Sequence, residues 1–136
     1  MSLQYLLDTN VCIGYLTRRS QSVYDRILAT PRQTVAICDI VKFELYFGAY
    51  KGSRTQENLK QLDLFFGDLV SLPFDAAAAE IAAQVRVSLQ RQGTPIGPYD
   101  LQIAAIALVH DLTLVTHNLR EFERVGGLRC EDWEEG

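Results

Sequence analysis

The sequence alternates short apolar segments with longer amphipathic ones, and this alternation constrains the fold more than any other feature. Short runs of apolar and β-branched side chains are typical of buried strands, whereas apolar positions spaced by three and four residues are typical of helices. Strands are expected at residues 3–7, 34–37, 69–72, 112–116 and 128–130. Because a helix is expected after each of the first four, we predict an α/β fold with a central, mostly parallel sheet and helices on both faces.

Capping residues mark where several of the helices begin. The first helix follows the opening strand directly and is expected to be capped by Thr9 or Asn10. Asp39 is the expected cap of a helix that continues to about Ala49, and Asp75 the expected cap of a long helix. The apolar stripe of that long helix consists of Ala78, Ile81, Ala82, Val85 and Leu89. Further helices are expected near residues 23–28, 59–66 and 98–110.

Length and charge point to one ordinary globular domain. A chain of 136 residues has room for one hydrophobic core, so we expect a single domain over residues 1–136. The net charge is −4, and six of the acids lie in residues 121–136. Nucleic-acid binders are usually basic, but acids that bind metal are neutralised, so the charge does not exclude an RNA substrate. We find no membrane span and no signal peptide, and expect a cytoplasmic protein.

The three cysteines do not form a recognisable framework. Cys12, Cys38 and Cys130 are odd in number, far apart and not arranged as C-x-x-C, which argues against both disulfides and a zinc site. Each has apolar neighbours, and we expect reduced thiols packed in or near the core.

Asp8 follows the first expected strand, at the edge where ligands bind in parallel sheets. Taken alone, an aspartate at such a junction is more often a cap or a turn residue. Glu44 adds information because it shares an apolar helical stripe with Ile40, Phe43 and Phe47. The opposite side of that helix is also apolar, so we expect the helix to be buried nearly all round. A buried carboxylate requires a cation, which leaves an arginine or a metal ion open.

Asp100 is a third acid expected to point inward. Pro98 suits the first helical position, and an acid in the first turn is favoured by the helix dipole. Nevertheless, the apolar stripe formed by Ile103, Ala104, Ala107 and Leu108 continues from Asp100. We therefore predict that three acids from separate segments converge on divalent metal.

A fourth polar segment follows the expected strand at residues 112–116. Thr116 and Asn118 lie at the strand end, and Glu121 comes three residues after Asn118, so both polar groups can face the same cleft. The alternative for Glu121 is a surface position paired with Arg124. Oxygen ligands of this kind suit Mg²⁺ or Mn²⁺, as one ion or as a pair.

Two histidines and a tryptophan are assigned simpler roles. His110 ends a helix, where a cation is favoured, and we interpret it as structural. His117 either lines the cleft or occupies a surface loop, and the pattern favours the loop. Trp133 is expected to anchor the C-terminal segment through its large apolar area.

These motifs resemble, in order and from end to end, the VapC-type toxins of type II toxin–antitoxin pairs, which are PIN-domain ribonucleases. The matching segments are Leu6-Leu7-Asp8-Thr9-Asn10-Val11, Phe43-Glu44-Leu45, Pro95-Ile96-Gly97-Pro98-Tyr99-Asp100 and Leu114-Val115-Thr116-His117-Asn118. The segment from Arg124 to Trp133 is similar to one branch of these toxins.

The resemblance implies a PIN fold and a Mg²⁺-dependent endoribonuclease, with Mn²⁺ as a possible substitute, that inhibits translation. It also implies homodimers, and a cognate VapB-type antitoxin that forms a higher assembly with the toxin. Members with a similar C-terminal segment cut initiator tRNA in the anticodon loop, so this tRNA is the expected substrate.

The same resemblance assigns the metal to Asp8, Glu44 and Asp100. The family often has a fourth acid near position 118, where this chain has an amide. Glu121 is then the expected fourth catalytic acid, with Thr116 and Asn118 in support. No substrate-binding residue is assigned.

Two alternatives to a ribonuclease are a phosphotransfer enzyme and a non-catalytic RNA-binding module. Phosphotransfer of the haloacid-dehalogenase kind needs a second acid two residues after the first, and Asn10 occupies that place. A non-catalytic PIN-like RNA-binding or scaffolding module usually lacks one or more core acids, and all three are present here.

Overall fold

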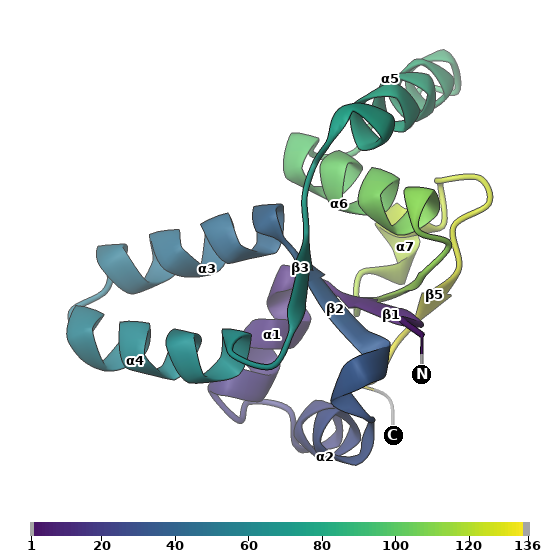
Figure 1. Cartoon of the computed structure of the whole chain (residues 1–136). Coiled ribbons are helices and arrows are strands. Elements are labelled where there is room, and N and C mark those ends of the chain that lie inside the picture. The colour runs from purple at the N-terminus through teal and green to yellow at the C-terminus, as the bar shows by residue number, and fades with distance from the viewer. Residues whose placement is uncertain (1, 135–136) are drawn as a thin grey trace.

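A five-stranded parallel sheet forms the centre of the protein (Figure 1), whose computed structural model describes residues 2–134. The strands lie in the order β3-β2-β1-β4-β5 and all neighbours pair in parallel. Their bounds are β1 Tyr5–Leu7, β2 Val35–Cys38, β3 Val70–Leu72, β4 Thr113–Val115 and β5 Cys130–Glu131. The predicted α/β class and parallel sheet are confirmed, although the last strand begins two residues later than expected.

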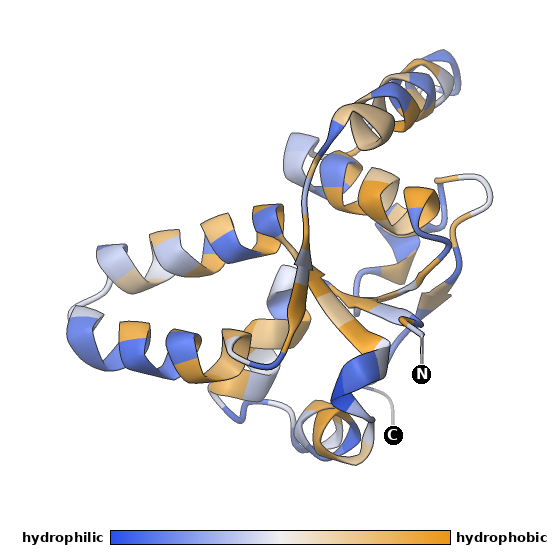
Figure 2. Ribbon diagram, in the orientation of Figure 1, coloured by the Kyte–Doolittle hydropathy of each residue, from blue (hydrophilic) through white to orange (hydrophobic). Residues whose placement is uncertain are grey.

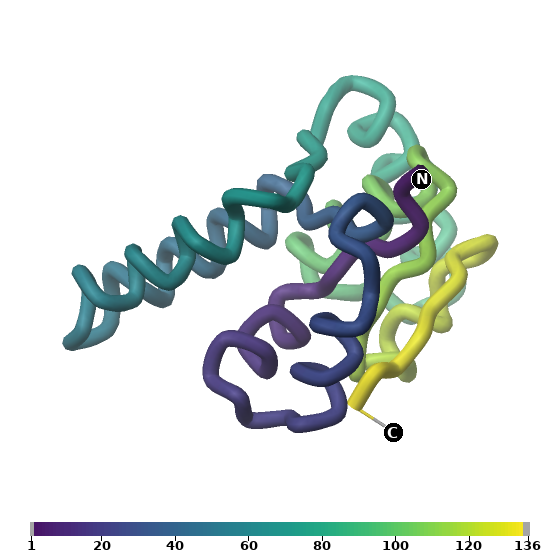
Figure 3. The backbone as a smooth tube through the Cα atoms, turned by 60° about the horizontal axis from the view of Figure 1, so that its bottom comes forward, coloured from purple at the N-terminus to yellow at the C-terminus, as the bar shows by residue number. Residues whose placement is uncertain are grey.

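Helices cover both faces of the sheet. They are α1 Thr9–Leu16, α2 Gln21–Ala29, α3 Asp39–Lys51, α4 Thr55–Phe66, α5 Ala76–Arg91, α6 Pro98–Val109 and α7 Leu119–Phe122, with a 3₁₀ turn at Arg32–Thr34. Helices α5 and α6 pack together on one side and α1 and α2 on the other (Figure 1). The α3–α4 pair extends beyond the sheet, as Figure 3 also shows. Within residues 2–134, no helix is long and apolar enough to cross a membrane.

The inner strands form the core. All four residues of β2 are buried, and Leu6 and Leu7 of β1 have no exposed surface. The strands are correspondingly apolar in Figure 2. A parallel strand covered on both faces needs apolar side chains on each, which explains the continuous apolar runs in the sequence.

Two of the predicted helix caps are wrong by one residue. Asp8 itself caps α1, since its Oδ1 accepts a hydrogen bond from the Thr9 amide at 2.7 Å. Cys38 occupies the cap position of α3, and the Asp39 carboxylate instead accepts a hydrogen bond from the Ser71 hydroxyl. In both cases the strand leads into the helix without an intervening loop. The predicted cap of α5, Asp75, is confirmed by its bond from the Ala78 amide at 3.0 Å.

The expectation that α3 is buried nearly all round is also wrong. Val41, Leu45 and Ala49 face the core, but the side chains of Phe43, Phe47 and Tyr50 are exposed, the last by 66%. The reason is the position of α3, which extends beyond the sheet and is covered on only part of its surface (Figure 1). Glu44 is consequently half-buried.

The tryptophan anchor predicted from the sequence is confirmed. The Trp133 side chain is 3% exposed and meets the Tyr5 ring edge-on at 5.1 Å between ring centroids. The Arg26 guanidinium lies 4.7 Å from the centre of the Trp133 ring, and the indole N–H of Trp133 donates to Glu131. These contacts fix the chain after β5 against β1 and α2.

We expect Trp133→Ala to lower the free energy of unfolding by about 3–5 kcal/mol, because it leaves a cavity between β1 and α2. Urea unfolding measures the effect. Leu64→Ala is the control, since that large apolar side chain is 80% exposed, and it should change stability by about 0.5 kcal/mol or less. Equal effects of the two substitutions would contradict the anchoring role.

Candidate active site

Asp8 and Thr116 meet at the centre of the sheet. Leu7 of β1 pairs with Val115 of β4, which places the two following residues side by side. The Thr116 hydroxyl donates to Asp8 Oδ2 at 2.8 Å, and the Asp8 side chain is buried. The chain passes from β1 outward to β2 and β3 and then returns to β4 on the other side of β1. A parallel sheet binds ligands at such a switch point, beyond the carboxyl ends of its strands.

Glu44 reaches the same site from α3. The Thr9 hydroxyl donates to Glu44 Oε1 at 2.7 Å, while its backbone amide donates to Asp8, so Thr9 alone contacts two of the acids. The described partner of Glu44 is therefore a hydroxyl group rather than an arginine. Sequence analysis did not assign Thr9 to the site, although its place directly after Asp8 was the available signal.

Asp100 and Glu121 complete the group of acids. Pro98 is the first residue of α6, as predicted, and Asp100 lies in its first turn. Glu121 accepts a hydrogen bond from the Gly97 amide at 3.1 Å, which ties α7 to the loop before α6. Charge interactions with Glu121, Asp8 and Glu44 all act on Asp100, which indicates that the four carboxylates share one site.

Asn118 organises the turn between β4 and α7. Its backbone amide donates to the Thr116 hydroxyl at 3.0 Å, and its side-chain amide donates to Glu121 Oε2. The expectation that Asn118 and Glu121 share a face is confirmed. The alternative pairing of Glu121 with Arg124 is not observed, because Arg124 donates instead to the Pro95 carbonyl at 3.2 Å.

Two of the acids, Asp100 and Asp8, have raised pKa values. Burial raises the pKa of Asp100 to about 7, and the charges of Glu121, Asp8 and Glu44 act in the same direction. Burial also raises the pKa of Asp8, although hydrogen bonds from Thr116 and Thr9 oppose the shift. Oxygen donors that repel one another in this way suit a divalent cation, which removes the repulsion.

Comparison with known proteins agrees with this geometry. The PIN domain matches residues 5–128. The chain belongs to the PIN-domain family. It is 42% identical to the tRNA(fMet)-specific endonuclease VapC of Shigella flexneri, over 96% of this chain and 98% of that protein.

Solved structures of VapBC complexes are also similar. The DNA-bound VapBC of Salmonella typhimurium gives a TM-score of 0.90 at 40% identity, covering 96% of this chain and 98% of that one. VapBC2 of Rickettsia felis bound to a promoter DNA fragment gives a TM-score of 0.89 at 32% identity, and the match covers 96% of this chain and 99% of that one. This PIN-domain chain therefore lies in the VapC group, as its motifs indicate.

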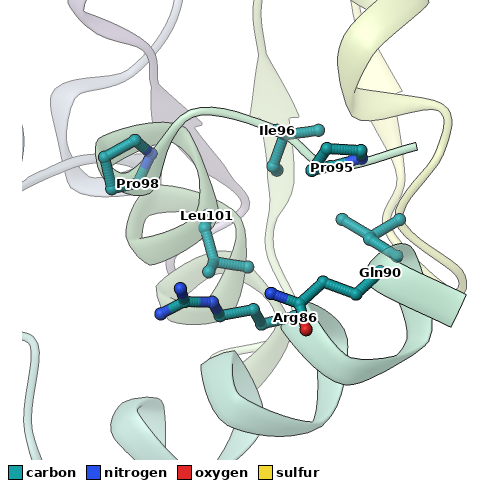
Figure 4. Close-up of a pocket in the computed structure, with 7 residues that line it drawn as sticks. Arg86, Gln90, Pro95, Ile96, Pro98 and Leu101 are labelled. Atoms are coloured by element: carbon teal, nitrogen blue, oxygen red, sulfur yellow. The ribbon is translucent and has the colours of Figure 1, made fainter. Parts of the chain in front are cut away.

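Two cavities of the PIN domain lie against helices that carry the acids, and Glu44 is the acid that lines one of them. One, of about 260 Å³, is lined by Glu44 together with apolar side chains of α1, α3 and α4. The other, of about 250 Å³, lies between α5 and α6 (Figure 4). Its lining includes Arg86 of α5, Pro95 of the loop before α6 and Leu101 of α6. Sequence analysis did not identify either cavity.

In the presence of a chelator, we expect the protein to lose stability as the pH rises from about 5 to about 8. Asp100 has a pKa near 7 when folded, above its ordinary value of 3.8, so its protonated form favours the folded state. This contribution is present at low pH and is lost as the pH rises through about 7. Asp100→Asn should flatten the dependence, measured as the free energy of unfolding in urea.

Asp68→Asn serves as the control because that acid is exposed in the loop before β3. It should leave the pH dependence of the wild type unchanged. Parallel curves for the wild type and Asp100→Asn would show that Asp100 does not titrate in this range.

Proposed function

We propose that this protein is the toxin of a toxin–antitoxin pair, an endoribonuclease that cuts initiator tRNA in the anticodon loop and thereby inhibits translation. The observation that carries the proposal is the convergence of Asp8, Glu44, Asp100 and Glu121 at the switch point of the sheet. The substrate follows from the Shigella flexneri relative, which is named a tRNA(fMet)-specific endonuclease.

PIN-domain nucleases are generally dependent on divalent metal. For this chain we infer Mg²⁺, with Mn²⁺ as a substitute, held by Asp8, Glu44 and Asp100. The donor set supports the inference, because it consists of carboxylate oxygens and includes a group with a pKa of about 7 that gains a proton when no cation is near. The chemistry that such an ion supplies is polarisation of the scissile phosphate and a lower pKa for the attacking water.

The surrounding residues hold the acids in place. Thr116 donates to one oxygen of Asp8 while the Thr9 amide holds the other, so both are oriented before any ligand binds. The Thr9 hydroxyl does the same for Glu44. Glu121 is tied to Gly97 and Asn118 and lies near enough to Asp100 for the two carboxylates to interact. Fixed geometry of this kind lowers the cost of reaching the transition state.

The antitoxin is proposed to dock in the cavity beside Glu44. Ile13, Leu16, Leu45 and Leu62 supply most of the apolar lining. Asn58 and Gln61 add amide groups, and Glu44 adds a negative charge. An amphipathic segment with an arginine or lysine matches this combination. Similar chains are solved as VapBC complexes.

We also propose that the chain forms a single domain over residues 1–136, acts in the cytoplasm where translation takes place, and pairs with a second copy of itself. The exposed aromatic side chains of α3 and α6 support the pairing. The rings of Phe43 and Tyr99 meet edge-on, with 5.6 Å between their centroids. Together with the exposed side chains of Phe47 and Tyr50 they form an apolar surface that favours contact with another chain.

Asp8→Asn should abolish cleavage of initiator tRNA while leaving the fold intact. The amide can still cap α1 but brings no charge to the metal. Cleavage by purified protein, with and without EDTA, measures the effect. Asp75→Asn is the matched control, because Asp75 caps α5 away from the site, and it should cleave at the wild-type rate.

Two results would overturn the enzymatic function. One is full cleavage by folded Asp8→Asn, and the other is cleavage that EDTA does not affect. A chain that binds RNA but never cuts it would be a non-catalytic scaffolding module.

Glu121→Gln should weaken cleavage about 10–100-fold, chiefly by raising the Mg²⁺ concentration required. The amide keeps its acceptor for Gly97 but removes the negative charge beside Asp100. Asn118→Asp should lower the requirement, since it adds a carboxylate next to Thr116. Mg²⁺ titrations of the cleavage rate measure both effects.

The control for these titrations is Glu123→Gln, an exposed acid two residues away. Its curve should coincide with that of the wild type. If all four curves coincide, Glu121 has no part in metal binding and the site has three acids.

A further inference from the structure

A second group of possible metal ligands lies outside the four-carboxylate site. His117 Nδ1 is 2.9 Å from Asp132 Oδ2 and 2.9 Å from Glu134 Oε2. These three side chains come from the turn after β4 and from the segment after β5. Their ligand atoms lie within 4.8 Å of one another. Neither acid was assigned a role from the sequence. Of the two positions considered for His117, the cleft and a surface loop, the sequence favoured the loop, and its side chain is exposed.

The sheet holds the group in place. Val115 of β4 pairs with Glu131 of β5, and the Thr116 amide donates to the Glu131 carbonyl at 2.9 Å. The residues that follow these two strands are therefore neighbours. Because parallel strands end at the same edge of a sheet, His117 and Asp132 are brought together by register rather than by a flexible loop.

The chain around the two acids is fixed as well. Trp133 is buried, and the Ser22 hydroxyl lies 2.9 Å from the Trp133 carbonyl and 2.8 Å from that of Glu134, so it can donate to either. The Glu134 amide donates to Asp132 Oδ1, and the Asp132 side chain is only 9% exposed. Little further ordering is needed for the three ligand atoms to act together, which favours binding.

We propose that His117, Asp132 and Glu134 form a binding site for a divalent transition-metal ion, with Zn²⁺ as the probe. One imidazole nitrogen and two carboxylate oxygens form a ligand set that zinc accepts at about 2.0–2.2 Å. Ligands at that distance around a tetrahedral ion lie about 3.4 Å apart, so the 2.9 Å separations here need to widen by only about 0.5 Å to admit one.

The donor chemistry distinguishes this group from the carboxylate site. Asp8, Glu44, Asp100 and Glu121 offer only oxygen, which suits magnesium, whereas an imidazole nitrogen shifts preference toward zinc, nickel or copper. Cysteine thiols compete weakly, because burial raises the pKa of Cys38 and of Cys130 to about 11 and keeps both protonated at neutral pH.

Metal bound here would stabilise the fold. The ligands are assembled only when β4 and β5 are paired, so the ion binds the folded chain and not the unfolded one. His117 also follows Thr116, whose hydroxyl holds Asp8. Occupancy therefore fixes the turn that carries part of the carboxylate site, independently of whether RNA is cut.

The test uses Asp8→Asn/Asp100→Asn protein, in which the carboxylate site is weakened. Isothermal titration with Zn²⁺ should show one ion per chain, and zinc at about 100 times its Kd should raise the Tm by roughly 5–10 °C. Adding His117→Asn should weaken binding at least tenfold and reduce the Tm shift to about half or less at the same zinc concentration. Asp132→Asn should act in the same direction.

His110→Asn is the matched control, since it removes the other histidine of the chain from the exposed end of α6. It should leave zinc binding unchanged. The proposal is overturned if the parent protein binds no zinc, if His117→Asn binds it as tightly as the parent, or if both histidine variants lose it equally. Circular dichroism of each variant verifies that the fold is retained.

Discussion

The hydrogen bond from Thr116 to Asp8 is the contact on which the candidate site depends. It joins the ends of β1 and β4, the two strands on either side of the switch point. Parallel pairing of these strands sets the position of both residues, so the core of the sheet determines where the first carboxylate lies. Thr9 and Asn118, one residue after Asp8 and two after Thr116, then extend the network to Glu44 and Glu121.

This arrangement concentrates negative charge at a cost to stability. Four carboxylates lie near one another, and Asp100 responds with a pKa of about 7. A site that repels its own charges favours either a proton or a cation, and at neutral pH a divalent ion can compete for it. The free energy gained by burying the apolar strands offsets the repulsion among these carboxylates, so a stable core allows a functional site that lowers stability.

The sequence predicted the sheet and the acids because both depend on local patterns. Short apolar runs identify strands buried on both faces, and Asp8 and Asp100 are recognisable from the strand end and the helix start that carry them. The exposure of Phe43 and Phe47 was not predictable, because a helix apolar on all sides does not indicate which side the sheet covers. The bond from Gly97 to Glu121 likewise depends on how α7 packs against a distant loop.

The C-terminal segment extends the same principle to the edge of the sheet. β5 adds only two residues, yet it places Asp132 beside His117 and Trp133 against Tyr5. An edge strand this short cannot be stable alone, so the buried indole and the Ser22 hydroxyl hold it in place. In a sheet of parallel strands, every residue that follows a strand comes to the same edge. Polar groups from β1, β4 and β5 therefore gather there, and the ligand atoms each strand contributes determine which ions that part of the edge can bind.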